Sequence, residues 1–344
     1  MRKHNILSHS KLHFGNEEYT GAQDSQKDLT SASTFTSCSF NSQAESGGGA
    51  IYFHSSSTLT VSNSFFNKCN SSAGEGGAVY CVNCGKVSIT TSVFFHCACT
   101  KACTSCGGLL IEEALSLPAI SHTDFISCSA AQDGGGFYIY GSTGGINGEN
   151  VPVSNCRFVN CIAIGNIGQT YHDSDGGGLV FWQIDHTIGI SNSLIVKCQS
   201  AARAGGSFIA IHNIYFDNII RFCFYSGNTA EKGRNALIHF NNPSSDLWSI
   251  VFYHSFTSDA SLTNSLIQNY PDASEVTDNW LPQGSIYFVY STRCPSKARG
   301  NTQFCIYSGT TELLKIISAA FSVQASQPRH NSLSHLLILP SLDV

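Results

Sequence analysis

Charged residues are scarce in this chain, and a basic surplus is absent. Asp, Glu, Lys and Arg make up 12% of the 344 residues, and the formal net charge is −5. This balance disfavours nucleic acid as a partner. Apolar runs such as 316–321 and 336–339 are too short to cross a bilayer, so we expect no membrane insertion by this chain. The solvent face must instead consist of Ser, Thr, Asn and Gln, which is typical of secreted or cell-surface proteins.

Signatures of common catalytic sites are missing as well. The chain has no phosphate-binding loop, no Gly-x-Ser-x-Gly elbow and no His-Glu-x-x-His motif. The polygalacturonase signatures Asn-Thr-Asp, Asp-Asp and Gly-His-Gly are also absent, and the carboxylates are scattered along the chain. We therefore expect no enzymatic activity and no cofactor.

Glycine, by contrast, is plentiful, and it recurs in pairs. Gly48-Gly49 opens the segment Gly-Gly-Ala-Ile-Tyr, and the equivalent positions begin at Gly76, Gly107, Gly135, Gly177, Gly205 and, in a degraded copy, Gly233. The steps between them are 28, 31, 28, 42, 28 and 28 residues. A period of this size indicates an array of one supersecondary unit.

A second signal, Phe-x-x-Cys, alternates with the glycine pairs. It occurs at Phe35/Cys38, Phe66/Cys69, Phe94/Cys97, Phe125/Cys128 and Phe158/Cys161, and Ile195/Cys198 continues it. Short β-branched runs lie between the two signals, so each unit has three short strands and no segment for a crossover helix. Parallel strands without helical crossovers pair from unit to unit when the chain coils. The sequence therefore predicts an all-β parallel β-helix solenoid of about eight coils.

The repeats divide the chain into three parts. Residues 1–30 are polar and predict an N-terminal arm or a partial first coil. Residues 31–292 form the predicted β-helix, with clear repeats over 33–240 and degenerate repeats over 241–292, where 284–288 predicts one more strand. In 293–344, Leu313, Ile316, Ile317 and Ala320 have helical spacing. This short helix is expected to cap the open end of the solenoid, followed by a loose tail.

Cysteine is abundant, with 15 residues, so at least one thiol is unpaired or joined to another chain. Stacked coils bring equivalent Cα atoms about 4.8 Å apart, but the parallel Cβ vectors stay too far apart for an ordinary disulfide. We therefore expect a ladder of buried free thiols that act as small apolar fillers. Its members occupy the same place in successive units: Cys38, Cys69, Cys97, Cys128, Cys161 and Cys198.

A zinc site is the alternative for part of this cysteine set. Cys81-x-x-Cys84 and Cys103-x-x-Cys106 are separated by 18 residues, which fits the spacing of a zinc ribbon. However, the first pair lies in a glycine-pair strand and its turn, and the second lies in the loop that enters the next coil. We interpret them as part of a cysteine-rich solenoid without a metal.

Two candidate binding regions remain. Phe53, Tyr140 and Trp182 each stand fourth after a glycine pair, and they would form an aromatic stripe for a glycan or protein if this position faces outward. The alternative is that the position faces the core. The second region holds His172, Asp173 and Asp175, in the insertion that lengthens one step to 42 residues. The alternative there is a solvated bulge on the solenoid edge.

The repeat motifs resemble those of the polymorphic outer-membrane protein family, Gly-Gly-Ala-Ile and Phe-x-x-Asn. Residues 48–51 and 76–79 are similar to the first motif, and residues 66–69 and 158–161 to the second, with cysteine in place of asparagine. Cysteine-bearing repeats of this kind occur in surface proteins of parasitic protists. The resemblance covers roughly residues 33–240 and implies a right-handed parallel β-helix displayed outside a cell, with adhesion as its role. It implies no catalytic residues, because the motifs are structural.

These observations predict a non-enzymatic, adhesin-like surface or secreted protein. It would bind a protein or glycan ligand on host or neighbouring cells through one face of the solenoid. A polysaccharide-active β-helix enzyme, lyase or hydrolase, and a purely structural scaffold are the alternatives. We expect an extracellular or cell-surface location, although the first nine residues are basic and show no apolar signal-peptide segment.

Overall fold

The computed structural model describes the greater part of the repeats and none of the residues before 17 or after 289. The described ranges are 17–23, 25–45, 47–72, 74–100, 105–116, 118–141, 150–165, 176–184, 187–201, 206–211, 217–221, 223–226, 228–230, 238–241, 249–253, 256–257, 267–269 and 285–289. Every secondary-structure element in these ranges is a β-strand, and all the strand pairings are parallel. The predicted all-β class is therefore confirmed for the described residues, although none of the sheets closes on itself there.

One sheet of nine strands, which we call the tyrosine sheet, follows the glycine pairs. Its strands alternate between buried and half-buried positions, so one face packs on the core and the other faces outward. In the order of the sheet, its strands are β2 (Lys27–Leu29), β5 (Ile51–Phe53), β9 (Val79–Val82), β13 (Leu109–Glu112), β17 (Phe137–Tyr140), β21 (Leu179–Ile184), β25 (Ser207–Ile211), β29 (Ile238–Asn241) and β32 (Ile267–Asn269).

A sheet of 17 strands, the phenylalanine sheet, contains two rows joined through its first strands, β1 (Glu17–Gln23) and β3 (Ser33–Asn41). One row consists of β6 (Thr58–Ser62), β10 (Lys86–Thr90), β14 (Ala119–Ser121), β18 (Asn150–Ser154), β22 (Thr187–Ser191), β26 (Asp217–Arg221), β30 (Ser249–Tyr253) and β33 (Ser285–Val289). The other row consists of β7 (Phe65–Asn67), β11 (Val93–Phe95), β15 (Asp124–Ile126), β19 (Arg157–Val159), β23 (Leu194–Val196), β27 (Phe224–Ser226) and β31 (Phe256–Thr257).

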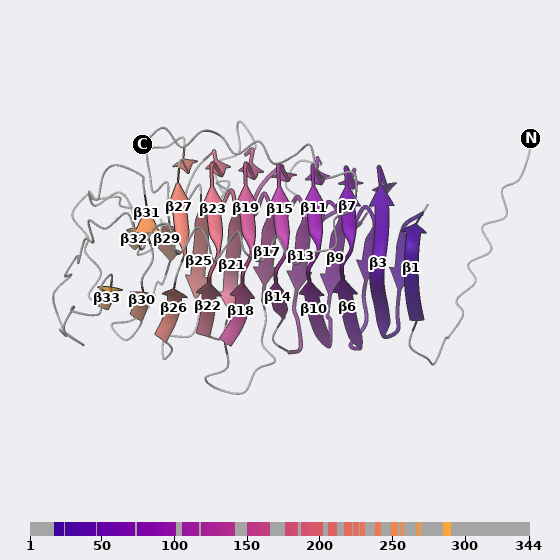
Figure 1. Cartoon of the computed structure of the whole chain (residues 1–344), viewed down its shortest axis with the longest axis horizontal. Coiled ribbons are helices and arrows are strands. Elements are labelled where there is room, and N and C mark those ends of the chain that lie inside the picture. The colour runs from indigo at the N-terminus through magenta and orange to yellow at the C-terminus, as the bar shows by residue number, and fades with distance from the viewer. Residues whose placement is uncertain are drawn as a thin grey trace, which may run out of the picture.

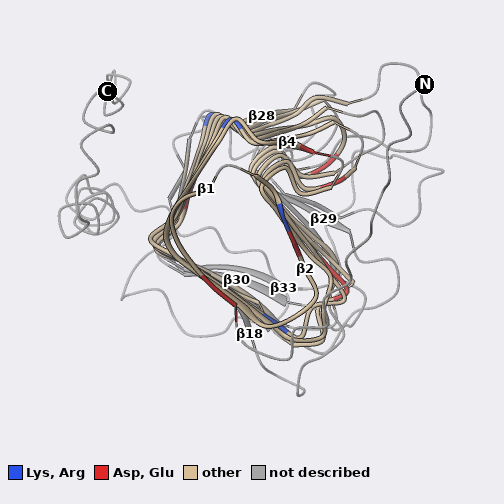
Figure 2. Cartoon of the chain, turned by 90° about the vertical axis from the view of Figure 1, so that its right-hand side faces the viewer, with Lys and Arg blue, Asp and Glu red and all other residues tan. Residues whose placement is uncertain are grey.

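The remaining sheet contains seven two-residue strands, one from each unit. They are β4 (Ala44–Glu45), β8 (Asn70–Ser71), β12 (Ala98–Cys99), β16 (Ser129–Ala130), β20 (Ile162–Ala163), β24 (Gln199–Ser200) and β28 (Thr229–Ala230). Figure 1 shows the strands of each sheet following one another along the long axis of the molecule. Seen along that axis, successive units overlay closely and carry few charged residues (Figure 2).

The core is a column of stacked phenylalanine rings. Phe40, Phe66, Phe94, Phe125 and Phe158 are fully buried, and neighbouring rings lie nearly parallel with centroids 4.6–5.0 Å apart. Parallel pairing in register places these rings above one another, for example Phe94 between Phe66 and Phe125. Phe66, Phe94, Phe125 and Phe158, from the Phe-x-x-Cys motifs, therefore form with Phe40 a continuous aromatic column through the core.

At the glycine corner, three consecutive positions of each unit stack on the same positions of the next unit, which gives three columns of small residues. The middle column is glycine in each described unit: Gly49, Gly77, Gly107, Gly135 and Gly177. A Cβ on any of these would collide with the backbone of the next unit. The preceding column has positive φ and holds Gly48, Gly76, Cys106, Gly134 and Gly176. The following column holds Ala50, Ala78, Gly108, Gly136 and Gly178. A glycine pair therefore occupies different columns in different units.

Described strands lie at both ends of the array of repeats. Residues 17–29 lie within the predicted arm, and they supply β1 and β2, which pair with β3 and β5. The strand predicted at 284–288 is confirmed as β33 (Ser285–Val289). The predicted C-terminal helix and tail lie outside the described residues. Within the described ranges, the structure contains no apolar helix of membrane-spanning length.

Candidate ligand-binding face

The outward face of the tyrosine sheet carries several half-buried aromatic side chains. Strand alternation sends residues such as Ile51 and Val79 into the core and sets their neighbours outward. The outward residues form two columns in register. One column contains Tyr52, Tyr80, Leu110, Tyr138 and Val180, and the other contains Val82, Glu112, Tyr140 and Trp182. We call these two columns the tyrosine face.

The middle of the tyrosine face has an apolar cluster of its own, outside the main core. Cys106, Leu110, Tyr138 and Val180 are buried there, although they lie on the outward side of the sheet. The half-buried rings of Tyr80, Tyr140 and Trp182 pack against this cluster. Because these rings lie on a rigid sheet and keep part of their surface in solvent, they form a preorganised apolar platform.

The predicted stripe of Phe53, Tyr140 and Trp182 is wrong as a single column. Tyr140 and Trp182 are register partners on the outward face, whereas Phe53 is fully buried and shares its column with Phe181. The reason is the shift of the glycine pair by one column between these units. Counting four residues from the pair therefore reaches opposite sides of the strand.

Two carboxylates lie near β9, Glu112 on the tyrosine face and Glu75 beside it. Tyr80 Oη donates a hydrogen bond of 2.5 Å to Glu112 Oε2. Glu75 lies immediately before the glycine corner that leads into β9, and it is half-buried. Burial, and then the charge of Glu112, raise the pKa of Glu75 to about 7. Burial and the hydrogen bond to Glu112 also raise the pKa of Tyr80. The two carboxylates therefore interact with each other and with the Tyr80 ring.

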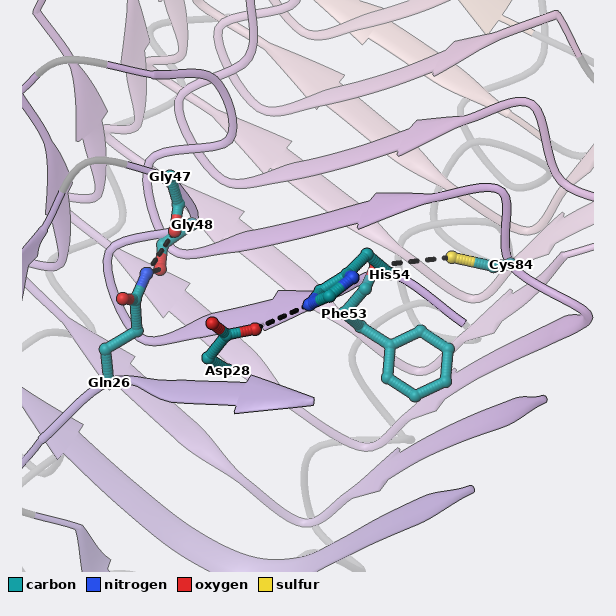
Figure 3. A network of polar contacts seen from close by, with 7 residues as sticks. All are labelled: Gln26, Asp28, Gly47, Gly48, Phe53, His54 and Cys84. Carbon is teal, nitrogen blue, oxygen red and sulfur yellow. Dashed lines mark hydrogen bonds and ion pairs between the residues drawn. The ribbon is translucent and has the colours of Figure 1, made fainter. Parts of the chain in front are cut away.

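A third carboxylate lies on the other side of the tyrosines. Asp28 on β2 is the register partner of Tyr52, and its Oδ1 lies 2.7 Å from His54 Nε2. The His54 ring stacks on Tyr52 at 4.8 Å, and Tyr52 stacks on Tyr80 at 5.3 Å. Figure 3 shows His54 directed at Asp28, with the ring of Phe53 pointing away from that pair.

Gln26 holds the turn that precedes β5. Its Nε2 donates to the carbonyl oxygens of Gly47 and Gly48, the latter at 2.6 Å (Figure 3). On the core side, the Cys84 thiol donates to the Phe53 carbonyl at 3.9 Å. These contacts fix the backbone of β5 from both ends, so Tyr52 and His54 are presented by a well-anchored strand.

Among the described zinc-ribbon cysteines, the Cys81 and Cys84 thiols are hydrogen-bonded to each other, but Cys106 does not join them. Cys81 and Cys84 belong to the main core, whereas Cys106 belongs to the outer cluster beneath the tyrosine face. Cys103 lies outside the described residues. In the described ranges, no three histidine, cysteine or acidic side chains converge as metal ligands. The predicted loop region of His172, Asp173 and Asp175 also lies outside the described residues.

The predicted cysteine ladder is present for five of its six members. Cys69, Cys97, Cys128, Cys161 and Cys198 are fully buried and carry free thiols. Each thiol donates to the carbonyl of an aromatic residue one unit earlier, for example Cys97 to Phe66 at 3.4 Å and Cys161 to Phe125 at 3.3 Å. Burial raises the pKa of the Cys97 and Cys128 thiols, which keeps them protonated and poorly nucleophilic. Burial disfavours the Cys161 thiolate, but hydrogen bonds with the Cys128 and Cys198 thiols lower the pKa of Cys161. Complete burial in the main core gives the ladder a packing role.

Cys38 lies in a different column, which corrects the prediction for this residue. Strand β3 is long enough to pair with both β6 and β7, and it sets Phe40, not Phe35, opposite Phe66. Cys38 instead begins a second buried column, in which the Cys38 N–H donates to the Ser64 hydroxyl at 3.1 Å. The N–H groups of Ser64 and Cys156 donate in the same way to the hydroxyls of Ser92 and Ser193. The members of this column are Cys38, Ser64, Ser92, Thr123, Cys156, Ser193 and Cys223.

One position of the ladder column is an asparagine that was not predicted from the sequence. Asn228 occupies the next position after Cys198, and its Oδ1 accepts a 2.9 Å hydrogen bond from the Cys198 N–H. Its Nδ2 donates to the Ile195 carbonyl, also at 2.9 Å. The signal was the spacing Tyr225-x-x-Asn228, in which tyrosine replaces phenylalanine and asparagine replaces cysteine.

Comparison with known proteins gives no assignment: no family model, curated protein or solved structure matches the chain.

Proposed function

We propose that the protein is a right-handed parallel β-helix of about eight coils that acts as a non-enzymatic, adhesin-like binding protein on a cell surface or after secretion. Parallel pairing between equivalent strands of successive units supports the β-helix, as in the series β5, β9, β13, β17 and β21. The resemblance of the repeat motifs to polymorphic outer-membrane proteins supports the handedness and the extracellular role.

The observation that carries the binding proposal is the set of half-buried rings on the tyrosine face. Tyr80, Tyr140 and Trp182 pack on a buried apolar cluster and still reach solvent. Aromatic side chains held in this way contribute large contact areas at a low cost in conformational entropy, which suits both protein and glycan ligands. We assign the ligand contact to Tyr140 and Trp182, which are register partners on neighbouring strands.

The test is a binding measurement on a glycan array and on whole cells. We expect Trp182→Ala and Tyr140→Ala each to weaken binding about tenfold or more, as removal of a central aromatic anchor does. Phe95→Ala is the matched control, because Phe95 is a half-buried outward aromatic residue on the phenylalanine sheet. Absence of binding to any glycan or cell would contradict the proposal and favour the structural scaffold.

The enzymatic alternative is tested on pectic and other acidic polysaccharides, with and without calcium. We expect no new reducing ends and no unsaturated products. Turnover that is lost when Asp173 and Asp175 are changed to Asn would overturn the non-enzymatic proposal and assign a polysaccharide-active enzyme.

A further inference from the structure

We propose that the end of the tyrosine face around Tyr52 and Tyr80 docks an extended basic segment of a partner protein, whose lysine or arginine side chains contact Asp28, Glu75 and Glu112. This inference rests on the proposed binding function and names the class of partner for one part of the face.

Aromatic rings and carboxylates lie side by side at this end of the tyrosine face. Tyr52 and Tyr80 stack at 5.3 Å and form a continuous aromatic surface across β5 and β9. Asp28 lies on one side of this pair, in register with Tyr52. Glu112 lies on the other side, where it accepts a hydrogen bond from the Tyr80 hydroxyl. An ammonium or guanidinium group over a tyrosine ring is attracted both by the ring and by an adjacent carboxylate.

Most of the negative charge at this end of the tyrosine face is uncompensated. The two columns of the tyrosine face contain no lysine or arginine from Tyr52 to Trp182. Glu75 and Glu112 take part in neither of the two ion pairs found among the described residues, which are His54–Asp28 and Arg157–Asp124. The nearby Lys27 lies over the Tyr19 ring and donates to Ser25, so it is directed elsewhere. The face therefore offers negative charge for which the described residues provide no cation beyond His54.

The raised pKa of Glu75 is consistent with a cation-binding role for this end of the face. Burial and the charge of Glu112 raise its pKa to about 7, so an ionised Glu75 is unfavourable beside Glu112 while the face is free. A bound cation between the two carboxylates would relieve that repulsion and remain shielded from bulk solvent. Complementary charge of this kind is also what steers a basic partner to an acidic surface.

The spacing of the carboxylates indicates the length of the ligand. Asp28 on β2 and Glu112 on β13 are separated by three strand-to-strand steps, through β5 and β9. Glu112 also stands two residues beyond Leu110, which shares the column of Asp28 and Tyr52, so the two Cα positions are about 16 Å apart at the usual strand spacing and rise. An extended peptide spans this distance in roughly four to five residues. A single ammonium group cannot contact both residues at this separation, whereas a segment with two basic residues about four positions apart can. The partner is therefore a protein segment.

The experiment measures binding of the full chain to a dye-labelled glycine–serine peptide with lysines about four residues apart. The same peptide with acetylated lysines is the ligand control. We expect the lysine peptide to bind and the acetylated peptide to bind about tenfold or more weakly. Glu112→Gln and Glu75→Gln should each weaken binding several-fold, and thermal unfolding of each variant confirms that it is folded.

Glu45→Gln is the matched control, because Glu45 is an exposed carboxylate on β4, outside the tyrosine face. An equal loss in Glu45→Gln would mean that only net charge matters and would overturn the inference. Free lysine or spermidine binding as tightly as the peptide would likewise overturn it in favour of a small amine. If the peptide does not bind but Trp182→Ala still lowers glycan or cell binding, this inference alone is wrong. If both measurements fail, the proposed function is wrong as well.

Discussion

At the scale of single residues, the left-handed backbone conformation is as important as the buried side chains. Lys68, His96, Ser127, Asn160 and Lys197 each precede a ladder cysteine and have φ between 52° and 54°. This conformation costs energy for residues other than glycine. Backbone hydrogen bonds between units offset the cost, as from Lys68 N–H to the Phe95 carbonyl at 2.8 Å. Each corner is therefore a left-handed residue followed by a small buried one.

Glu75 gives a prediction at this scale, because its pKa is raised to about 7 from the ordinary value of 4.5. The folded chain binds this proton more tightly than the unfolded chain does. The contribution of Glu75 to stability is therefore fully present below pH 4.5 and is lost as the pH rises through about 7. We expect Glu75→Gln to leave stability unchanged near pH 4 and to raise the free energy of unfolding near pH 8 by about 1 kcal/mol, allowing for its solvent contact.

The measurement is denaturant unfolding of wild type and variant across that pH range. Glu45→Gln, at an exposed site, should show no such divergence between the two pH values. A Glu75→Gln effect that is as large at pH 4 as at pH 8 would contradict the assignment of the raised pKa to Glu75.

At the scale of the elements, the glycine corner determines how closely two units approach. A Cβ at Gly49 would lie 2.7 Å from the Asn70 backbone nitrogen, which is too close for any real contact. At Gly47, two residues earlier, the nearest atom to such a Cβ is 3.8 Å away. We expect Gly49→Ala to lower the free energy of unfolding by about 1–3 kcal/mol through overpacking, and Gly47→Ala to be neutral or slightly stabilising. Thermal unfolding measures both, and equal effects would contradict the column assignment.

The same corner shows what the sequence was able to predict. The repeat period, the short strands and the alternation of glycine pairs with Phe-x-x-Cys were sufficient to predict parallel β-structure and most of the cysteine ladder. They were not sufficient to predict the phase of each pair, because Ala50 and Cys106 stand where other units have glycine. An error of one residue reverses the face of a strand, and for that reason Phe53 was placed in the stripe with Tyr140 and Trp182.

The long strand β3 was a second obstacle to prediction. Its Phe35 and Cys38 have the spacing of the ladder motif, but its register is set by pairing along the whole strand with both β6 and β7. The candidate site depended on the same information. Glu75 and Glu112 are 37 positions apart in sequence, and only the register between β9 and β13 brings Glu112 to the Tyr80 hydroxyl.

At the scale of the whole molecule, the described residues include two outward sheet faces with columns of apolar side chains. One is the tyrosine face. The other is a half-buried column on the phenylalanine sheet, formed by Phe95, Ile126, Val159 and Val196. The two faces differ in charge, because the tyrosine face combines its rings with Asp28, Glu75 and Glu112 at one end. This combination of apolar platform and charge is the reason for assigning ligand binding to the tyrosine face.

The most direct test of this assignment is hydroxyl-radical footprinting of the full chain, free and bound to the cells or glycan surface that it recognises. The account predicts that ligand lowers the labelling of Tyr80, Tyr140 and Trp182 and leaves Phe95 and Ile126 unchanged. Protection of Phe95 and Ile126, with the rings of the tyrosine face labelled as in the free protein, would contradict it.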